Sequence, residues 1–272
     1  AVSFDKKSGL LSQYQVNNIE LVDQGLSGNF WRAVTDNDKG WQVQNKLNVW
    51  NKASTEQKLE SISTEQVNKS SVSITTVHML ANKVAKLTTQ YLISANGQIE
   101  VDTKLSPLKD NLPNLPRVGM HMQVAKAFKQ LEWFGRGPLS SYSDRKNSMA
   151  VGVYQSQVSE QLHDYVRPQE SGNKSDVRWF TLTDAQGNGL KISSNTPLNV
   201  TAVPLSKFAL YKVKEIPRHN SEVMLSETTN VRIDMLQMGV GGDNSWGAKP
   251  HDEFLIPAIE YKFSFTLIPL VK

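Results

Sequence analysis

Hydrophobic and polar side chains alternate along most of this chain, and such alternation is the pattern of half-buried β-strands. The runs that show it most clearly are residues 71–80, 86–94, 99–105, 118–124, 131–133, 177–182, 231–236 and 261–267. No window of a dozen residues keeps a helical period with good helix formers, so helix is expected only as a turn or two, near residues 47–58 and 158–164. Many short strands separated by turns predict an all-β fold, a large antiparallel β-sandwich.

Two turn signals separate some of these strands. Asn96-Gly97 lies between two alternating runs and predicts a hairpin with a primed turn, because this dipeptide tolerates positive φ angles. The polar stretch 184–189 predicts a second turn. The chain has no internal repeat, no low-complexity tract and no convincing linker, so we expect residues 1–272 to form one domain.

Composition narrows the class of protein. A chain of 272 residues can bury roughly three quarters of its unfolded surface, so folding needs no metal or disulfide. The net charge is only +4 and there is no basic run, which argues against a nucleic-acid partner. There is no cysteine, which excludes a disulfide framework, a thiolate zinc site and cysteine catalysis. No apolar run approaches the ~20 residues of a membrane span and no signal peptide precedes Ala1, so no membrane partner is expected, and cytoplasm and periplasm both remain open.

The most distinctive segment is the glycine-rich stretch Gly239-Val240-Gly241-Gly242-Asp243-Asn244-Ser245-Trp246-Gly247. It follows the expected strand at 231–236, and its glycines allow positive φ angles and close approach of a neighbouring segment. An indole on such a loop either folds back as a lid on the sandwich edge or offers its face to the apolar side of a sugar ring. We predict a substrate-binding loop formed by Asp243, Asn244, Ser245 and Trp246.

Two motifs share features with binding loops but lack essential parts. Asp36-Asn37-Asp38-Lys39-Gly40 begins like a calcium loop, yet it lacks the later oxygen ligands and the flanking helices, so a polar turn is expected. Gly239-Val240-Gly241-Gly242 follows a strand as a dinucleotide fingerprint does, but Trp246-Gly247 and Pro250 prevent the helix that must come next. We therefore expect no metal and no cofactor.

Histidines and carboxylates are the remaining candidates for chemistry. The histidines are His78 and His121 in expected strands, interpreted as structural, and His163, His219 and His251 in loop-like stretches, with no pair spaced for a metal. Glu160, Asp164, Glu170 and Asp176 gather in one polar stretch with arginines. Glycosidic hydrolysis usually takes two carboxylates, but we favour arginine–carboxylate pairs that brace a buried loop.

The same interpretation applies to Asp144-Arg145, beside which the Tyr142 hydroxyl is expected to cap a corner. No residue of the chain is assigned a catalytic role.

Several ordered motifs resemble the C-terminal domain of the large bacterial β-galactosidases of glycoside hydrolase family two. They are Phe4 to Ser12, which is similar to the opening strand and turn of that domain, Phe30 to Gly40 ("FxRAPTDND+G"), Leu115 to Met120 ("LPRxG"), Glu132 to Arg145 ("WxGRGPxxxYxDR"), Tyr165 to Asn173 ("YxxPQENGN") and Met238 to Trp246 ("MGxGGDxSW"). The chain departs from these motifs at Val34, where proline is usual, at Leu139-Ser140-Ser141 in place of "xEN", and at Ser171 in place of asparagine.

The resemblance implies a β-sandwich of the galactose-mutarotase-like superfamily that follows a catalytic TIM barrel in the same polypeptide. In that family the acid/base and nucleophile glutamates lie in the barrel, so this chain alone is expected to be inactive. The aromatic residue that matches Trp246 stacks against the galactoside substrate, and the full-length enzyme is a possible homo-oligomer. Two other functions stay open, namely a free-standing aldose mutarotase or epimerase, which needs a general acid and base, and a carbohydrate-binding module.

Overall fold

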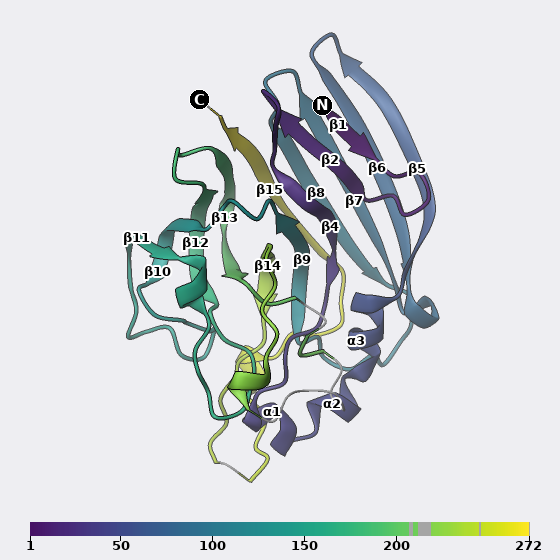
Figure 1. Cartoon of the computed structure of the whole chain (residues 1–272). Coiled ribbons are helices and arrows are strands. Elements are labelled where there is room, and N and C mark those ends of the chain that lie inside the picture. The colour runs from purple at the N-terminus through teal and green to yellow at the C-terminus, as the bar shows by residue number, and fades with distance from the viewer. Residues whose placement is uncertain (207–208, 212–218, 245, 272) are drawn as a thin grey trace.

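The fold is built almost entirely from β-strands (Figure 1). The computed structural model describes residues 1–206, 209–211, 219–244 and 246–271. The strands are β1 (Val2–Phe4), β2 (Leu11–Val16), β3 (Ile19–Glu20), β4 (Val22–Asn29), β5 (Gln57–Asn68), β6 (Ser71–Leu80), β7 (Ala85–Ser94), β8 (Ile99–Pro107), β9 (Arg117–Val124), β10 (Gln130–Gly137), β11 (Ala150–Gln157), β12 (Lys174–Thr183), β13 (Gly189–Val203), β14 (Thr229–Gln237) and β15 (Tyr261–Leu270). The helices are α1 (Asp36–Gly40), α2 (Val43–Lys46) and α3 (Asn48–Thr55), with 3₁₀ turns η1 (Ala81–Lys83), η2 (Val158–Gln161), η4 (Asn220–Glu222) and η5 (Asp252–Phe254).

Strand β13 joins the two layers of the sandwich. Its first half, residues 189–193, pairs with β15 on one side and β12 on the other. Its second half, residues 199–203, pairs with β14, which is followed by β9 and β4. One layer therefore runs β11-β10-β12-β13-β15-β8-β7-β6-β5, and the other runs β13-β14-β9-β4. The strand pairs are antiparallel, so the predicted large antiparallel β-sandwich is confirmed.

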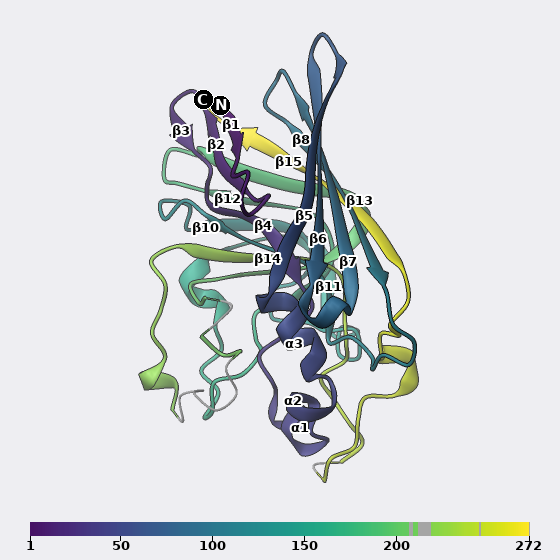
Figure 2. The same ribbon diagram turned by 90° about the vertical axis from the view of Figure 1, so that its right-hand side faces the viewer.

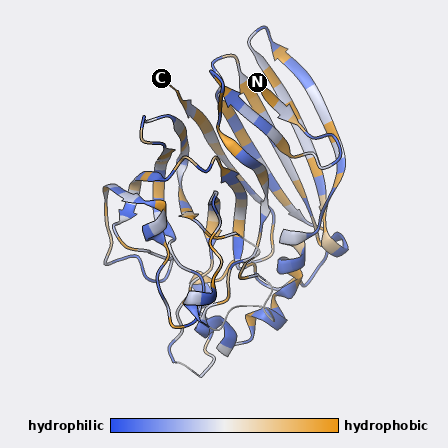
Figure 3. Cartoon of the chain, viewed as in Figure 1, coloured by the Kyte–Doolittle hydropathy of each residue, from blue (hydrophilic) through white to orange (hydrophobic). Residues whose placement is uncertain are grey.

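The alternation of side chains decides which face of each strand is buried. In β8, Ile99 and Val101 are buried while Glu100 and Asp102 are exposed. Figure 3 shows the same alternation of hydrophobic and hydrophilic positions along the neighbouring strands. Each large apolar side chain that is fully buried contributes about 1.5–3 kcal/mol, so this pattern supplies the main driving force for the sheet. The strands predicted at 71–80, 86–94, 99–105 and 118–124 are present as β6 to β9.

Strand β14 differs from its prediction. The alternation at 231–236 predicted a half-buried strand, but Arg232 and Asp234 are buried together with Val231 and Ile233. The strand is hydrogen-bonded to β13 and to β9 on its two sides, and its polar face is covered by the fold as well. Its polar face meets a charged partner instead of water, because Arg117 of β9 lies against Asp234 with 3.2 Å between Nε and Oδ2.

The β7–β8 hairpin turns at Asn96-Gly97 as predicted, although without the expected primed turn. The Ser94 amide donates to the Gln98 carbonyl at 2.9 Å, so residues 95–97 form a three-residue loop. Within this loop only Gly97 has a positive φ, of 85°. A single glycine in the left-handed region is the usual solution for a loop of this length. The turn predicted at 184–189 is also present, closed by the Asp184 amide on the Asn188 carbonyl at 2.8 Å.

The helical segments are short, and they gather at one end of the sandwich. Figure 2 shows α1, α2 and α3 at the end of the molecule opposite to both termini. The predicted turn or two of helix is confirmed within residues 47–58 by α3 and within 158–164 by η2. Among the described residues, no helix is long and apolar enough to span a membrane.

The N-terminal sheet β1-β2-β3 packs closely against the edge of the second layer. A Cβ atom added to Gly25 of β4 would lie 2.1 Å from the carbonyl oxygen of Leu11 in β2. The two backbones therefore approach to a distance that only glycine permits at this position. The contact fixes where the N-terminal strands sit on β4.

We expect Gly25→Ala to destabilise the chain by about 2 kcal/mol or more, because a backbone carbonyl cannot move aside as a side chain can. Chemical denaturation measures the free energy of unfolding. Gly152→Ala is the control, since its Cβ would meet only the Tyr154 ring, at 3.3 Å, on an edge strand. Equal losses for the two variants would contradict the close approach of β2 and β4.

Candidate functional site

The glycine-rich loop begins directly after β14 and is held at its base by a buried arginine. The Arg32 guanidinium donates to the carbonyl oxygens of Met238 and Gly239, the latter at 2.8 Å. It also pairs with the Asp38 carboxylate through Nε at 3.0 Å and a terminal nitrogen at 2.7 Å. Both side chains are almost fully buried. A planar guanidinium suits this place because it can donate to a carboxylate and to two carbonyls at once.

Asp38 belongs to α1, which replaces the polar turn expected at residues 36–40. The helix begins at a capping box, in which the Thr35 hydroxyl accepts from the Asp38 amide and the Asp38 carboxylate accepts from the Thr35 amide, each at 3.0 Å. Two reciprocal hydrogen bonds satisfy amides that a helix start leaves open, so even one turn is stable here. The Asp38 carboxylate is fully occupied by Arg32 and Thr35 and is not free for calcium.

Two more side chains hold the loop from other directions. The Asp144 carboxylate accepts from the Gly241 amide at 2.6 Å. The Asn37 side-chain amide of α1 donates to the Val240 carbonyl at 3.1 Å. The first part of the loop is therefore anchored by three side chains from two segments that are remote from it in sequence, residues 32–37 and Asp144.

The glycines of this loop serve close approach more than unusual backbone angles. A Cβ on Gly239 would lie 2.7 Å from the Asp144 carboxylate, and one on Gly242 would lie 2.5 Å from the Ala248 carbonyl. Of the glycines between 239 and 247, only Gly247 has a positive φ, of 101°. The glycines were expected to allow positive φ angles and close approach, and the structure uses close approach at Gly239 and Gly242 and a positive φ at Gly247.

Trp246 projects from the tip of the loop into solvent. Its side chain is 90% exposed, so it is not a lid on the sandwich edge. The Trp246 amide donates to Asn244 Oδ1 at 2.9 Å, which tightens the tip. His251 Nε2 lies 2.8 Å from Asp243 Oδ1, both side chains being exposed, and the hydrogen bond that the Asp243 carboxylate accepts raises the pKa of His251. Ser245, the fourth predicted site residue, lies outside the described residues.

The four carboxylates at 160–176 do not form one cluster. Glu170 is buried and accepts from Arg117 at 2.9 Å, and Asp176 is paired with Arg136 and Lys146, as the bracing interpretation predicted. Glu160 and Asp164 differ, because both are exposed. Glu160 accepts from the Gln157 amide at the start of η2, and Asp164 accepts from the Asn220 side chain. Bracing by arginine therefore holds for two of the four.

The expectations for Asp144 and Tyr142 are also wrong. Asp144 holds the Gly241 amide instead of an arginine. The Tyr142 hydroxyl is buried and has no hydrogen-bond partner in the described part of the chain, so it does not cap a corner. The Arg145 guanidinium lies over the Tyr142 ring, 5.1 Å from its centre.

The buried ion network beneath the loop was missed by sequence reasoning. Arg117 contacts Glu170 and Asp234, and burial raises the pKa of Asp234 to about 7 even though Arg117 opposes that shift. The Arg117–Asp234 contact is close but poorly aligned, since neither group completes a hydrogen bond with the other. The only signal was an arginine and an aspartate within strands, and periodicity alone assigned Asp234 to solvent.

The histidines of the strands are structural, as predicted. His78 is bonded to the Ser8 carbonyl at 2.8 Å, and His121 to the Asn230 side chain at 3.0 Å. No group of three or more metal-ligating side chains is found within the described residues.

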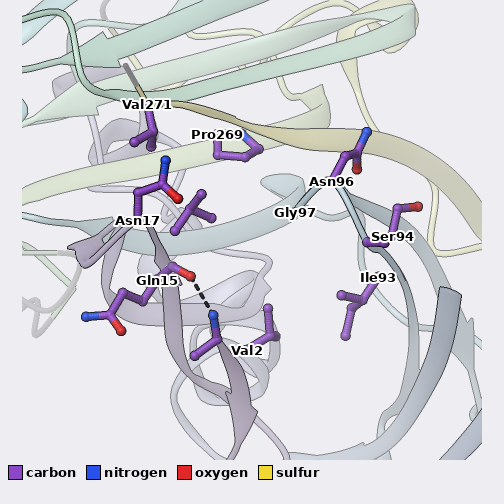
Figure 4. A pocket seen from close by; sticks show the side chains of 12 residues that line it. Val2, Gln15, Asn17, Ile93, Ser94, Asn96, Gly97, Pro269 and Val271 are labelled. Carbon is purple, nitrogen blue, oxygen red and sulfur yellow. Dashed lines mark hydrogen bonds between the residues drawn. The ribbon is translucent and has the colours of Figure 1, made fainter. Parts of the chain in front are cut away.

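A separate hollow of about 590 Å³ lies at the end of the sandwich that carries the termini (Figure 4). Val2, Gln15, Asn17, Ile93 and Pro269 line it, and none of its lining side chains is an acid or a base. Its lining side chains therefore offer no group for acid–base chemistry.

Comparisons with known proteins agree with the motifs. The family model described as β-galactosidase small chain matches residues 1–267. A β-galactosidase of Priestia megaterium is 38% identical over 98% of this chain and 25% of its own length. β-Galactosidases of Halalkalibacterium halodurans and Streptococcus thermophilus are 31% and 32% identical over 98% and 99% of this chain and 27% and 26% of theirs. The chain thus spans about a quarter of the length of these relatives.

Among solved structures, the chain is similar to a galactose mutarotase related enzyme from Lactobacillus acidophilus. The two are 10% identical with a TM-score of 0.47, over 99% of this chain and 94% of the other. A likeness this distant supports no argument about function.

We expect Asp144→Ala to loosen the glycine-rich loop. Loss of a hydrogen bond to a charged acceptor costs about 1.5–3 kcal/mol, so amide exchange at Gly241 should become at least about tenfold faster. Hydrogen exchange of the chain measures this rate. Asp184→Ala is the control, because Asp184 accepts from the amides of another turn. Unchanged exchange at Gly241 in Asp144→Ala would show that the carboxylate does not hold the loop.

Proposed function

Because this chain belongs to the β-galactosidase small chain family, we propose that residues 1–272 form one non-catalytic domain of an enzyme that hydrolyses terminal β-D-galactosides. The domain adds an aromatic loop to the sugar site and supports a catalytic barrel elsewhere in the same polypeptide. The galactoside contacts Trp246, with Asp243, Asn244 and Ser245 in the same loop.

The single observation that carries this proposal is the exposed indole on an anchored loop. A large aromatic ring that is 90% exposed leaves much apolar surface in water, and an indole that is apolar on its face and polar at one edge suits contact with a sugar ring. The base of its loop is held by Arg32, Asn37 and Asp144. Anchoring lowers the entropy that the ring must lose when a sugar stacks on it.

The buried carboxylates support a role without catalysis. Asp38, Glu170 and Asp234 are each buried against an arginine. A glycosidase needs one carboxyl group as an acid and a second as a nucleophile or base, with the sugar between them. Carboxylates that are occupied by arginines in the interior cannot reach a substrate.

The end of the molecule that carries Trp246 also suits contact with another domain. Three further apolar side chains are exposed on loops, namely Val166, Met224 and Leu225. Their loops are tied together and to α1, because Asn220 donates to Asp164 and the Gln169 side chain exchanges two hydrogen bonds with Asp36. Apolar side chains on a braced face favour a protein partner, and we propose the catalytic barrel as that partner.

The mutarotase alternative finds less support. Ring opening needs a general base and a general acid on either side of the anomeric centre. His78 and His121, the histidines on strands, are almost fully buried and hydrogen-bonded within the fold.

We expect Trp246→Ala, in a β-galactosidase polypeptide that contains this chain, to raise KM about fivefold and to slow transfer to sugar acceptors. Stacking on an indole contributes on the order of 1 kcal/mol, which corresponds to that factor. Steady-state kinetics on lactose and on a nitrophenyl galactoside provide the measurement. Trp246→Phe keeps an aromatic face and should lose less. Kinetic constants unchanged in Trp246→Ala would remove the residue from the site.

The purified chain by itself is expected to cleave no galactoside and to catalyse no aldose mutarotation. The first assay follows release of nitrophenol, and the second follows the optical rotation of fresh galactose. Galactoside cleavage would place catalytic carboxylates in this chain. Rapid mutarotation would instead revive the free-standing enzyme and refute the supporting role.

A further inference from the structure

A second cleft, of about 700 Å³, opens between the segments on either side of β11. One wall is the turn after β10 with Leu139 and Ser140, and the other is η2 with the loop that follows it. Its volume lies in the range of small-molecule sites. None of its lining residues belongs to the glycine-rich loop.

The floor of this cleft holds a lysine that has no carboxylate partner among the described residues. The Lys174 side chain begins β12, lines the cleft and is only 5% exposed. Its ammonium lies over the Trp133 ring, 5.0 Å from the centre, and has no carboxylate or hydrogen-bond acceptor within the described residues. A buried charge is normally paired, because taking it out of water is costly. Burial accordingly lowers the pKa of Lys174 to about 8.

The other charged and titratable groups of the cleft do not compensate Lys174. They are Arg145, Glu160, His163 and Tyr165. The Glu160 carboxylate, the only acidic group among the lining residues, already accepts from the Ser156 hydroxyl at 2.6 Å and the Gln157 amide at 2.9 Å. The Arg145 guanidinium adds a second positive charge at the cleft. The cleft therefore favours an anion.

A second polar side chain lies at the same cleft. Gln161 is 7% exposed and lines it. Its side-chain nitrogen donates to Ser156 and to the Gln157 carbonyl. Its Oε1 has no donor in the described part of the chain, but this atom is fully buried and not accessible from the cleft, so Lys174 is the group that selects the ligand.

We propose that this cleft binds a small hydroxylated carboxylate of the sugar-acid class, with the carboxylate on Lys174. The hydroxyls of Ser140 and Ser148 line the same cleft and suit a hydroxylated ligand body. A ligand carboxylate supplies the negative charge that the described residues do not place beside Lys174. The inference goes beyond the proposed function and does not rest on it.

Binding is tested by calorimetry with D-galacturonate as the probe and D-galactose as its neutral match. We expect saturable binding of galacturonate and none of galactose at the same concentrations. Lys174→Met keeps the apolar stem over Trp133 and should weaken binding at least about tenfold, the effect of losing a charged hydrogen bond. Lys174→Arg keeps the charge and should stay within about threefold of the native chain.

A second measurement needs no variant. The chain is acetylated near pH 8, and mass spectrometry follows the reaction at each lysine. Only the amine form of a lysine reacts, and the lowered pKa of Lys174 leaves part of it in that form. Galacturonate should slow acetylation of Lys174 at least about tenfold while leaving the exposed Lys6 unchanged, and inorganic phosphate should protect less. No protection by galacturonate, equal protection by galactose or phosphate, or unweakened binding in Lys174→Met would each overturn the assignment.

Discussion

The geometry of the candidate site depends on the buried guanidinium of Arg32. It joins Asp38 of α1 to the carbonyls that end β14, across a sequence separation of 206 residues in the case of Met238. Removing one partner of such a buried pair leaves an uncompensated charge and costs about 3–5 kcal/mol. If the loop detached from α1, the Arg32 charge would lose part of its hydrogen bonds in the interior. Trp246 can therefore be exposed to solvent while the base of its loop stays fixed.

The same principle extends through the interior next to the loop. Arg117 lies between Glu170 and Asp234, and desolvation raises the pKa of Asp234 to about 7 despite this neighbour. Buried ion pairs add little net stability, but they tolerate few alternative arrangements, because every misplaced charge is left unpaired. In this chain they fix how β9, β14 and the segment of Glu170 meet. Lys174 is the exception, since its charge faces a cleft and not an internal carboxylate.

Much of the sheet could be predicted from the sequence, whereas the burial of β14 and the presence of α1 could not. Period-two alternation places β6 to β8 correctly because each of these strands has one buried and one more exposed face. It also places β9, where apolar and polar residues alternate although both faces are buried. It fails for β14, where Asp234 is buried by an arginine from a strand more than a hundred residues earlier. It also missed α1, because a five-residue helix has no readable period and depends on the Thr35 and Asp38 capping box.

The sequence by itself determined the all-β class, the hairpin at Asn96-Gly97, the family and the loop that carries Trp246. These follow from local periodicity, from turn chemistry and from ordered motifs, which are properties of neighbouring residues. Only the tertiary structure decided that Trp246 points into water, that Asp144 holds Gly241, and that Lys174 has no carboxylate partner among the described residues. Each of these depends on which parts of the chain lie near one another in the fold, and sequence spacing does not encode that proximity.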